Sequence, residues 1–173
     1  METKAGDPGA FAHFNLHRVP SPAFVVDEAA LGRNLSILAD VKQRSGAKIL
    51  CAMKAFSMWK VAPIIGEYLD GVCSSGLWES RLARDYYRGE IATYCAGYKE
   101  SDMAEIVDIS DHVIFNSPHQ HRRFSSFLND SVDVGLRINP EHAEGEVPKY
   151  DPCSPGSRLG FPISQLKAEH IDG

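Results

Sequence analysis

Lys54 is the residue whose type and position in this sequence point most directly to chemistry. It closes the apolar run of residues 49–54, which has the length and composition of a buried β-strand. An ammonium group at the end of such a strand costs free energy unless it is used. Burial lowers the pKa of a lysine, and a neutral amine forms Schiff bases with carbonyl groups. Lys54 is therefore a candidate nucleophile, although on spacing alone a lysine that extends into water is the simpler interpretation.

Two further segments carry polar residues where chemistry is plausible. Arg137 follows the apolar run that starts at Val132, so it is a second charged group near a strand end. Residues 146–160 are rich in Pro, Gly and Ser and must form a loop, which contains Asp151, Ser157 and Arg158. A loop this long in a compact α/β unit is more often functional than not. The simpler alternatives are an ion pair for Arg137 and ordinary turn formation for Asp151 before a proline.

The elements that must position these residues repeat along the chain. Short apolar segments typical of strands alternate with helical patterns, and the strand starts are about 21 residues apart. The predicted strands are residues 49–54, 71–75, 91–96, 112–116 and 132–138, and the predicted helices are residues 59–69, 77–87, 100–109 and 119–128. A short strand at 23–26 and a helix capped by Asp27 and ended by Gly46 precede them. This alternation predicts β-α-β units and a parallel sheet.

Two architectures are compatible with that alternation, an open doubly wound sheet and a (β/α)8 barrel. The open sheet of the dinucleotide-binding type carries a Gly-x-Gly-x-x-Gly turn after its first strand, and this sequence has none. A barrel places its reactive groups at the carboxyl ends of its strands, where most of the predicted strands here have polar or small residues. We therefore expect an α/β fold that is part of a (β/α)8 barrel, with about five of its strands. Residues 1–22 are expected to be a lead-in and residues 23–173 the barrel portion, which a helix at 164–171 would continue.

Composition restricts the possible partners. The formal charge of the 173-residue chain is -5, and its basic residues are scattered, which argues against nucleic acid and anionic membranes and suits a small cationic substrate. No apolar run approaches the length of a membrane span. The four cysteines include no Cys-x-x-Cys pair, so neither a metal site nor a disulfide framework is indicated. We expect a cytoplasmic protein.

Three blocks of sequence, taken together, resemble a known family. Residues 54–59 (Lys-Ala-Phe-Ser-Met-Trp), 135–140 (Gly-Leu-Arg-Ile-Asn-Pro) and 150–160 (Tyr-Asp-Pro-Cys through Ser-Arg-Leu-Gly) are similar to the carboxynorspermidine (carboxyspermidine) decarboxylases of polyamine biosynthesis. These are alanine racemase-like, fold type III enzymes that depend on pyridoxal 5'-phosphate. The resemblance extends from about Pro20 to Gly173 and implies that the chain is the N-terminal portion of such an enzyme.

The resemblance also implies roles for individual residues. Lys54 would form the Schiff base with pyridoxal 5'-phosphate and assist the later proton transfers, and Arg137 would lie near the cofactor ring. Ser157 and Arg158 match the family's loop and are candidate substrate-binding residues. Asp151 is a candidate partner for an ammonium group of a polyamine-type substrate.

Other parts of the family's site have no counterpart in this sequence. The stacking histidine, the phosphate cradle, the acidic partner of the pyridine nitrogen and a C-terminal β domain would follow Gly173, and the site would be completed in a homodimer. The resemblance thus implies that this chain is inactive alone.

Two alternatives to this interpretation remain. One is a different fold type III enzyme, such as a diaminopimelate or ornithine decarboxylase or a racemase, although the Met58-Trp59 pair and the block at 150–153 argue against it. The other is a non-catalytic barrel protein that only binds pyridoxal 5'-phosphate.

Overall fold

A parallel β-sheet forms the centre of the structure, a computed structural model that describes residues 9–167. The strands lie side by side in sequence order, β1 to β5, and all neighbouring pairs are parallel. Their bounds are Leu50–Ala52 (β1), Gly71–Ser74 (β2), Glu90–Tyr94 (β3), His112–Phe115 (β4) and Asp133–Leu136 (β5). The predicted alternation and parallel sheet are confirmed. Each strand ends one or two residues before its predicted end.

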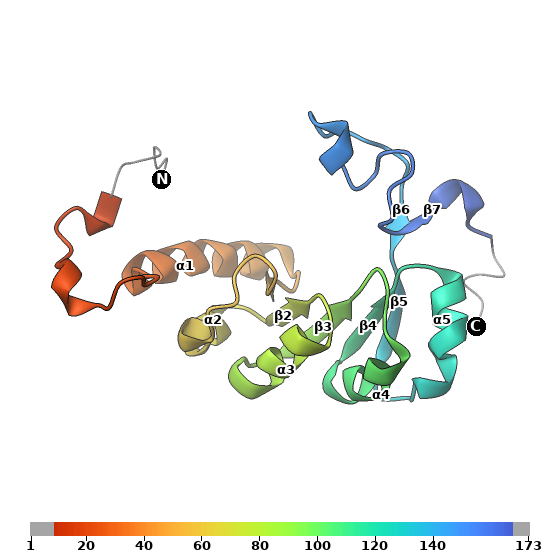
Figure 1. Cartoon of the computed structure of the whole chain (residues 1–173), viewed down its shortest axis with the longest axis horizontal. Coiled ribbons are helices and arrows are strands. Elements are labelled where there is room, and N and C mark those ends of the chain that lie inside the picture. The colour runs from red at the N-terminus through yellow and green to blue at the C-terminus, as the bar shows by residue number, and fades with distance from the viewer. Residues whose placement is uncertain (1–8, 168–173) are drawn as a thin grey trace.

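Four helices follow strands β1 to β4 and cover one face of the sheet (Figure 1). They are Ala62–Tyr68 (α2), Leu77–Tyr86 (α3), Glu100–Ile109 (α4) and Pro118–Phe124 (α5). Helix α3 packs on β2 and β3, and α5 packs on β4. Short 3-10 turns at Trp59–Val61 and Ser125–Phe127 extend α2 and α5 to nearly the lengths that the sequence predicts.

Helix α1, Glu28–Ser45, precedes the sheet and begins and ends where the sequence predicts. The Asp27 carboxylate accepts a hydrogen bond from the N–H of Ala30 at 3.0 Å, and Gly46 ends the helix in the left-handed conformation with φ 72°. The helix packs on α2 through a shared apolar cluster that includes Leu35. The segment 23–26, however, is not a strand: it pairs with none of the described strands, and Phe24 is 95% exposed.

The apolar core lies between the sheet and its helices. Its largest cluster joins β4 to α4 and α5 and contains Val113, Phe115, Met103, Ile106 and Phe124. A second cluster joins the ends of β1, β2 and β3 to α3 through Met53, Val72, Ile91 and Ala83. The helices and these core clusters lie on one face, which leaves the other face of the sheet without a covering helix.

Aspartates at the amino ends of two strands fasten the sheet. The Asp70 carboxylate accepts from the N–H of Ile49 at 2.9 Å, and the Asp111 carboxylate accepts from the N–H of Ile91 at 2.8 Å. Asp70 also pairs with Lys42 of α1 at 3.0 Å. In both cases an aspartate carboxylate accepts a hydrogen bond from a strand-end N–H group that the sheet leaves unpaired.

A long excursion separates β5 from the last described elements. Strand β6, Ile138–Asn139, pairs in parallel with β7, Phe161–Pro162, and residues 140–160 between them project beyond the sheet (Figure 1). The predicted strand 132–138 is thus divided between β5 and β6. Of the helix predicted at 164–171, the structure describes only a 3-10 turn at Ile163–Gln165, and residues 168–173 lie outside the described part.

No helix within residues 9–167 is long and apolar enough to cross a membrane. The same residues contain no cluster of three or more His, Cys, Asp or Glu side chains that could hold a metal ion.

Candidate functional site

The carboxyl ends of β1 to β5 lie at one edge of the sheet, because all five strands are parallel. On the face away from the helices, Ala52, Cys73 and Ala92 stand opposite one another in register across β1, β2 and β3. These side chains are small, so they leave space above the strands next to Lys54. The open face at the carboxyl edge is therefore the candidate site.

Lys54 lies on a tight turn directly after β1. The carbonyl of Ala52 accepts hydrogen bonds from the N–H groups of Ala55 and Phe56 at 3.0 and 3.1 Å, and this pair of bonds closes the turn. Met53 anchors it from below, since its side chain is only 1% exposed within the core. Local hydrogen bonding and one buried residue thus fix the backbone that carries Lys54.

The Lys54 side chain itself is exposed, and its ammonium forms no hydrogen bond or ion pair with any of residues 9–167. The sequence pattern predicts a buried strand end here, and the structure corrects that prediction, because β1 stops two residues earlier. The positive charge of Lys54 acts on Cys73 of the neighbouring strand. Burial raises the pKa of the Cys73 thiol, and Lys54 opposes that increase.

An apolar pocket adjoins the Lys54 turn. Its lining comes from residues 24–26, before α1, and residues 55–60, which follow Lys54 directly. Residues 55–59 of the block that resembles the family therefore line this pocket. Lys54 is thus followed directly in the chain by a largely apolar wall.

Arg137 lies between β5 and β6, on the same open face. Its guanidinium stacks over the ring of Tyr94 of β3, with 4.7 Å from the central carbon to the ring centroid. Its backbone is fixed on both sides, since its N–H donates to the carbonyl of Phe115 and its carbonyl accepts from Phe161, each at 2.8 Å. No carboxylate of the described residues pairs with Arg137, so the simple ion pair that we considered from the sequence does not form.

Asn116, at the end of β4, joins Tyr94 to the returning loop. Its carboxamide oxygen accepts from the Tyr94 hydroxyl and from the N–H of Gly160, each at 2.7 Å. Its carboxamide nitrogen donates to the carbonyl of Arg158 at 3.0 Å. The sequence analysis did not identify Tyr94 or Asn116 as site residues. Asn116 could have been identified, because it is a polar residue at the end of a predicted strand.

The Asp151 carboxylate organises the excursion of residues 140–160. It accepts from the N–H of Cys153 at 2.7 Å and from the N–H of Gly145 at 2.5 Å, and these bonds hold its pKa below the usual range. Ser157 accepts from the N–H of Leu159 at 3.2 Å, and the Arg158 side chain is exposed. The structure therefore gives Asp151 and Ser157 a place in turn formation, and their role in substrate binding stays a prediction.

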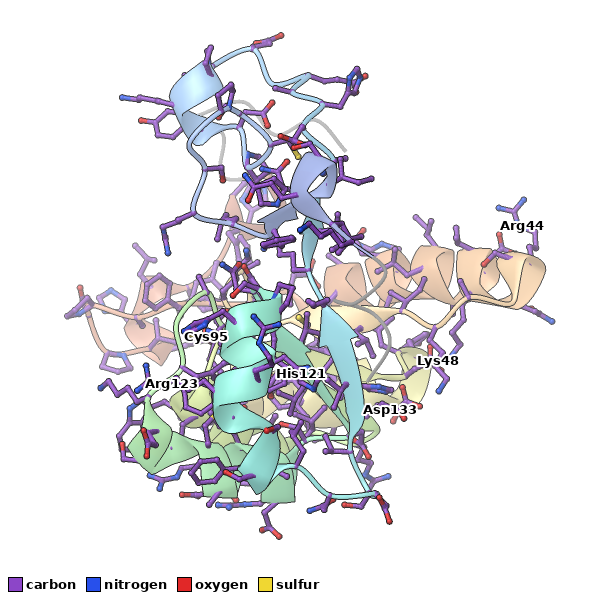
Figure 2. All side chains as sticks on the ribbon, turned by 90° about the vertical axis from the view of Figure 1, so that its right-hand side faces the viewer. Arg44, Lys48, Cys95, His121, Arg123 and Asp133 are labelled. Carbon is purple, nitrogen blue, oxygen red and sulfur yellow. The ribbon has the colours of Figure 1, made fainter. Side chains whose placement is uncertain are left out.

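The amino end of the open face is filled by charges that satisfy one another. Lys48 pairs with Glu90, which lies 3.4 Å from His112, and His112 lies 3.5 Å from Asp133. The hydrogen bond from Lys48 is the main cause that lowers the pKa of Glu90. Figure 2 shows Lys48 and Asp133 on the same side of the molecule, below the projecting excursion. These groups have partners already, which leaves the carboxyl edge as the place for a ligand.

The structure brings together some of the predicted residues and separates others. Arg137 and Arg158 both belong to the group around Asn116, near the outer strand β5. Lys54 follows β1, the outer strand on the other side of the sheet. Four strand spacings of about 4.8 Å, or roughly 19 Å, separate β1 from β5, but the Arg137 guanidinium lies over Tyr94 of β3, only two strands from β1. A ligand that contacts both Lys54 and Arg137 must therefore lie over the open face, between the outer strands β1 and β5.

Comparison with known proteins gives a consistent result. No family model matches the chain. The chain is 40% identical over 155 residues to the carboxynorspermidine/carboxyspermidine decarboxylase of Campylobacter jejuni, which is 90% of this chain and 40% of that protein. It is 37% identical over 152 residues to the carboxyaminopropylagmatine decarboxylase of Synechocystis, with 87% of this chain and 39% of the relative covered. It is also 38% identical over 142 residues to the decarboxylase of the first type from Herminiimonas arsenicoxydans, with 82% and 39% covered.

Solved structures agree with these relatives. Crystalline carboxynorspermidine decarboxylase from Campylobacter jejuni, bound to norspermidine, matches with a TM-score of 0.76 and 36% identity, over 87% of this chain and 38% of that one. D-threonine aldolase from Filomicrobium marinum shares the fold alone, with a TM-score of 0.60 and 19% identity over 75% and 37%. The predicted fold class, a partial (β/α)8 barrel of the alanine racemase-like type, is confirmed. The chain is thus homologous to the carboxynorspermidine/carboxyspermidine decarboxylases and spans about two fifths of their length.

Proposed function

We propose that this chain forms part of a pyridoxal 5'-phosphate-dependent decarboxylase that converts carboxynorspermidine or carboxyspermidine to norspermidine or spermidine, in the cytoplasm and as a homodimer. The observation that carries the proposal is Lys54, an exposed amine on a fixed turn at the carboxyl edge of a parallel sheet. The similarity to decarboxylases of this substrate class supports it. The remaining groups of the site are expected from other parts of the protein, so this chain alone is expected to be inactive.

The residues on the open face suit this cofactor. Lys54 has no competing partner among residues 9–167, so its amine is available to an aldehyde. The small side chains of Ala52 and Cys73 leave room for a flat ring over the neighbouring strands. Arg137 supplies a positive charge for an oxyanion, and stacking on Tyr94 occupies none of its N–H donors.

When bound, pyridoxal 5'-phosphate would supply an aldehyde for an amine and a ring that withdraws the charge left by loss of carbon dioxide. Lys54 would hold the cofactor and carry a proton on Nζ to and from the reacting carbon. Arg137 would bind an oxyanion and orient it against the sheet. The apolar side chains of this pocket that follow Lys54, namely Ala55, Phe56, Met58 and Trp59, would limit the access of water to the lysine.

The loop chemistry supports a cationic substrate. Residues 140–160 carry four carboxylates, Glu141, Glu144, Glu146 and Asp151, against the basic side chains Lys149 and Arg158. The backbone donors around Asp151 keep it ionised, and lone pairs remain on its oxygens for an ammonium group. One relative is named for a different substrate, carboxyaminopropylagmatine.

Trapping with borohydride tests the proposal directly. Pyridoxal 5'-phosphate is added to the native gene product that contains this chain, the mixture is reduced, and the modified peptide is located by mass spectrometry. We expect a pyridoxyl group on Lys54, its loss in Lys54→Ala, and its retention in Lys60→Ala, which removes an exposed lysine six residues away. An adduct on Lys60, or one that survives in Lys54→Ala, would exclude the proposed role of Lys54.

The same preparation distinguishes the reaction from mere binding. Release of carbon dioxide from carboxynorspermidine, dependent on Lys54, would support the decarboxylase. An adduct on Lys54 without turnover of any of the carboxylated polyamines would favour a binding protein.

A further inference from the structure

Tyr94 and Asn116 form a connected group with Arg137 at the carboxyl edge, although they come from three different strand ends. Tyr94 is the last residue of β3, Asn116 follows β4, and Arg137 follows β5. All three side chains are half-buried. Such a group requires the parallel sheet, because nothing in the sequence places residues 94, 116 and 137 together.

The contact between Arg137 and Tyr94 orients the guanidinium without using its hydrogen-bond donors. A carboxylate partner would occupy two N–H groups of an arginine, whereas the face of an aromatic ring occupies none. In the described residues the Arg137 side chain has this ring contact and no ion pair. Its donors therefore stay available to an oxyanion while its plane is held.

Asn116 holds the other side of this arrangement in place. Its oxygen accepts from the Tyr94 hydroxyl and the Gly160 N–H, so both lone pairs are used, and its nitrogen donates to Arg158. One side chain thus fixes the orientation of the tyrosine and the return of the excursion to the sheet. Aspartate lacks the N–H donor and leucine lacks all three bonds, so the geometry requires a carboxamide.

We propose that Tyr94 and Asn116 are positioning residues, which hold the Arg137 guanidinium ready to bind an oxyanion of the ligand that Lys54 holds. The proposal rests on the proposed function for the identity of that ligand. The oxyanion is a phosphate or a carboxylate, which the cofactor and the carboxylated substrate respectively provide. Tyr94 acts through its ring and Asn116 through the hydroxyl of Tyr94 and the backbone of residues 158–160.

The arrangement is tested first by NMR on the cofactor-free native gene product that contains this chain, with inorganic phosphate as the probe. The ring of Tyr94 shifts the side-chain proton resonances of Arg137 upfield, and the shifted signals are assigned by their loss in Arg137→Lys. We expect them to persist with a smaller shift in Tyr94→Phe, which keeps the ring but loses the hydrogen bond to Asn116, and to disappear in Tyr94→Leu. Tyr86→Leu, which removes an exposed tyrosine of α3, is the matched control and should leave them unchanged.

Phosphate titration then measures the consequence of losing the ring. Loss of a cation–π contact is expected to weaken phosphate binding at Arg137 by about fivefold in Tyr94→Leu. Asn116→Ala should accelerate exchange of the Gly160 amide and weaken phosphate binding less. Shifted resonances that survive in Tyr94→Leu, or equal phosphate binding in all variants, would overturn the proposal whatever the protein catalyses.

Kinetics of the native gene product identify the oxyanion. If Arg137 binds the cofactor, Tyr94→Leu weakens pyridoxal 5'-phosphate by about fivefold and pyridoxal, which has no phosphate, much less. If it binds the substrate, KM for carboxynorspermidine rises by a similar factor while inhibition by norspermidine, which lacks the carboxylate, is unchanged. Either result supports positioning when kcat changes less than twofold. A fall in kcat with unchanged KM and cofactor affinity, or the same effects in Tyr86→Leu, would contradict it.

If the wild-type protein neither binds the cofactor nor releases carbon dioxide, the proposed function is wrong, but the positioning role of Tyr94 and Asn116 is not thereby excluded. The NMR and phosphate measurements would still decide whether Tyr94 and Asn116 hold Arg137.

Discussion

Two charged residues flank β1 and serve different purposes. Asp70, beside the start of the strand, accepts from Ile49 and pairs with Lys42, so its charge is satisfied within the fold. Lys54, beyond the end of the strand, has no partner in the described residues. A charge that is held by neighbours contributes to stability, whereas one without a partner is available to a ligand. The distinction follows from the direction of the strand, because its carboxyl end is the open edge.

The charge of Asp70 makes the stability of the chain depend on pH. The N–H of Ile49 and the ammonium of Lys42 lower the pKa of its carboxyl in the folded state below the ordinary value of about 3.9. The unfolded chain therefore takes up this proton first as the pH falls. The stabilisation is fully present above pH of about 4 and is lost as the pH falls through the folded-state pKa.

Asp70→Asn should accordingly destabilise the chain at pH 7, and the difference from wild type should shrink as the pH falls below about 4 and through the lowered pKa of folded Asp70, where the aspartate also becomes neutral. Urea unfolding midpoints measured from neutral to acid pH test this. Asp108→Asn, an exposed position on α4, is the matched control and should show no such convergence. A difference that stays constant or grows in acid would contradict the assigned role of Asp70.

At the scale of elements, the parallel pair β6–β7 decides where the excursion returns. Gly160 makes this possible, since its φ of +85° is in the left-handed region and an added Cβ would lie 2.9 Å from the backbone nitrogen of Asn139. Gly156 has a similar φ of +78°, but an added Cβ there would meet nothing within 4 Å. An alanine at position 156 would thus introduce backbone strain alone, whereas an alanine at position 160 would introduce the same strain and a steric clash with β6.

Gly156→Ala should cost about 1–2 kcal/mol from backbone strain alone. Gly160→Ala should cost about 1–3 kcal/mol more, because β6 must move away. Amide exchange of Phe161, which donates to Arg137 across this pair, reports the loss locally, and urea unfolding reports it globally. Equal costs for the two substitutions would show that the close approach to β6 is not what requires glycine at position 160.

At the scale of the whole molecule, helices cover one face of the sheet and leave apolar groups exposed elsewhere. Val134, on the outer strand β5, is 45% exposed, and Phe24 is almost fully exposed beside the pocket next to Lys54. An outer strand with unpaired backbone groups is a surface on which further chain can pair. The chain by itself is therefore expected to associate.

Sedimentation velocity over about 1 to 100 μM chain should show association that increases with concentration. Val134→Lys places a charge on the outer strand and should reduce it. Val147→Lys, at a site of similar exposure (47%) in the excursion, is the control and should not reduce association. A chain that stays monomeric throughout, or equal effects of the two lysines, would show that β5 is not the surface responsible.

The sequence by itself determined the alternation of strands and helices, because hydrophobic period, the Asp27 cap and the Gly46 terminator are local signals. It also singled out the three blocks that the relatives share, and Lys54 and Arg137 within them. Local pattern failed at residues 23–26, since an apolar segment becomes a strand only where a sheet edge accepts it. It failed as well for the burial of Lys54, because the length of β1 depends on its pairing with β2.

Only the tertiary structure decided which residues share the site. Tyr94, Asn116 and Arg137 are at least 21 positions apart in sequence and meet because adjacent parallel strands end side by side. Asp151 looked like a partner for a cationic substrate from its residue type, yet its immediate partners are backbone N–H groups of its own loop. Residue type states which bonds a side chain can form, and the fold determines which of those bonds are already taken.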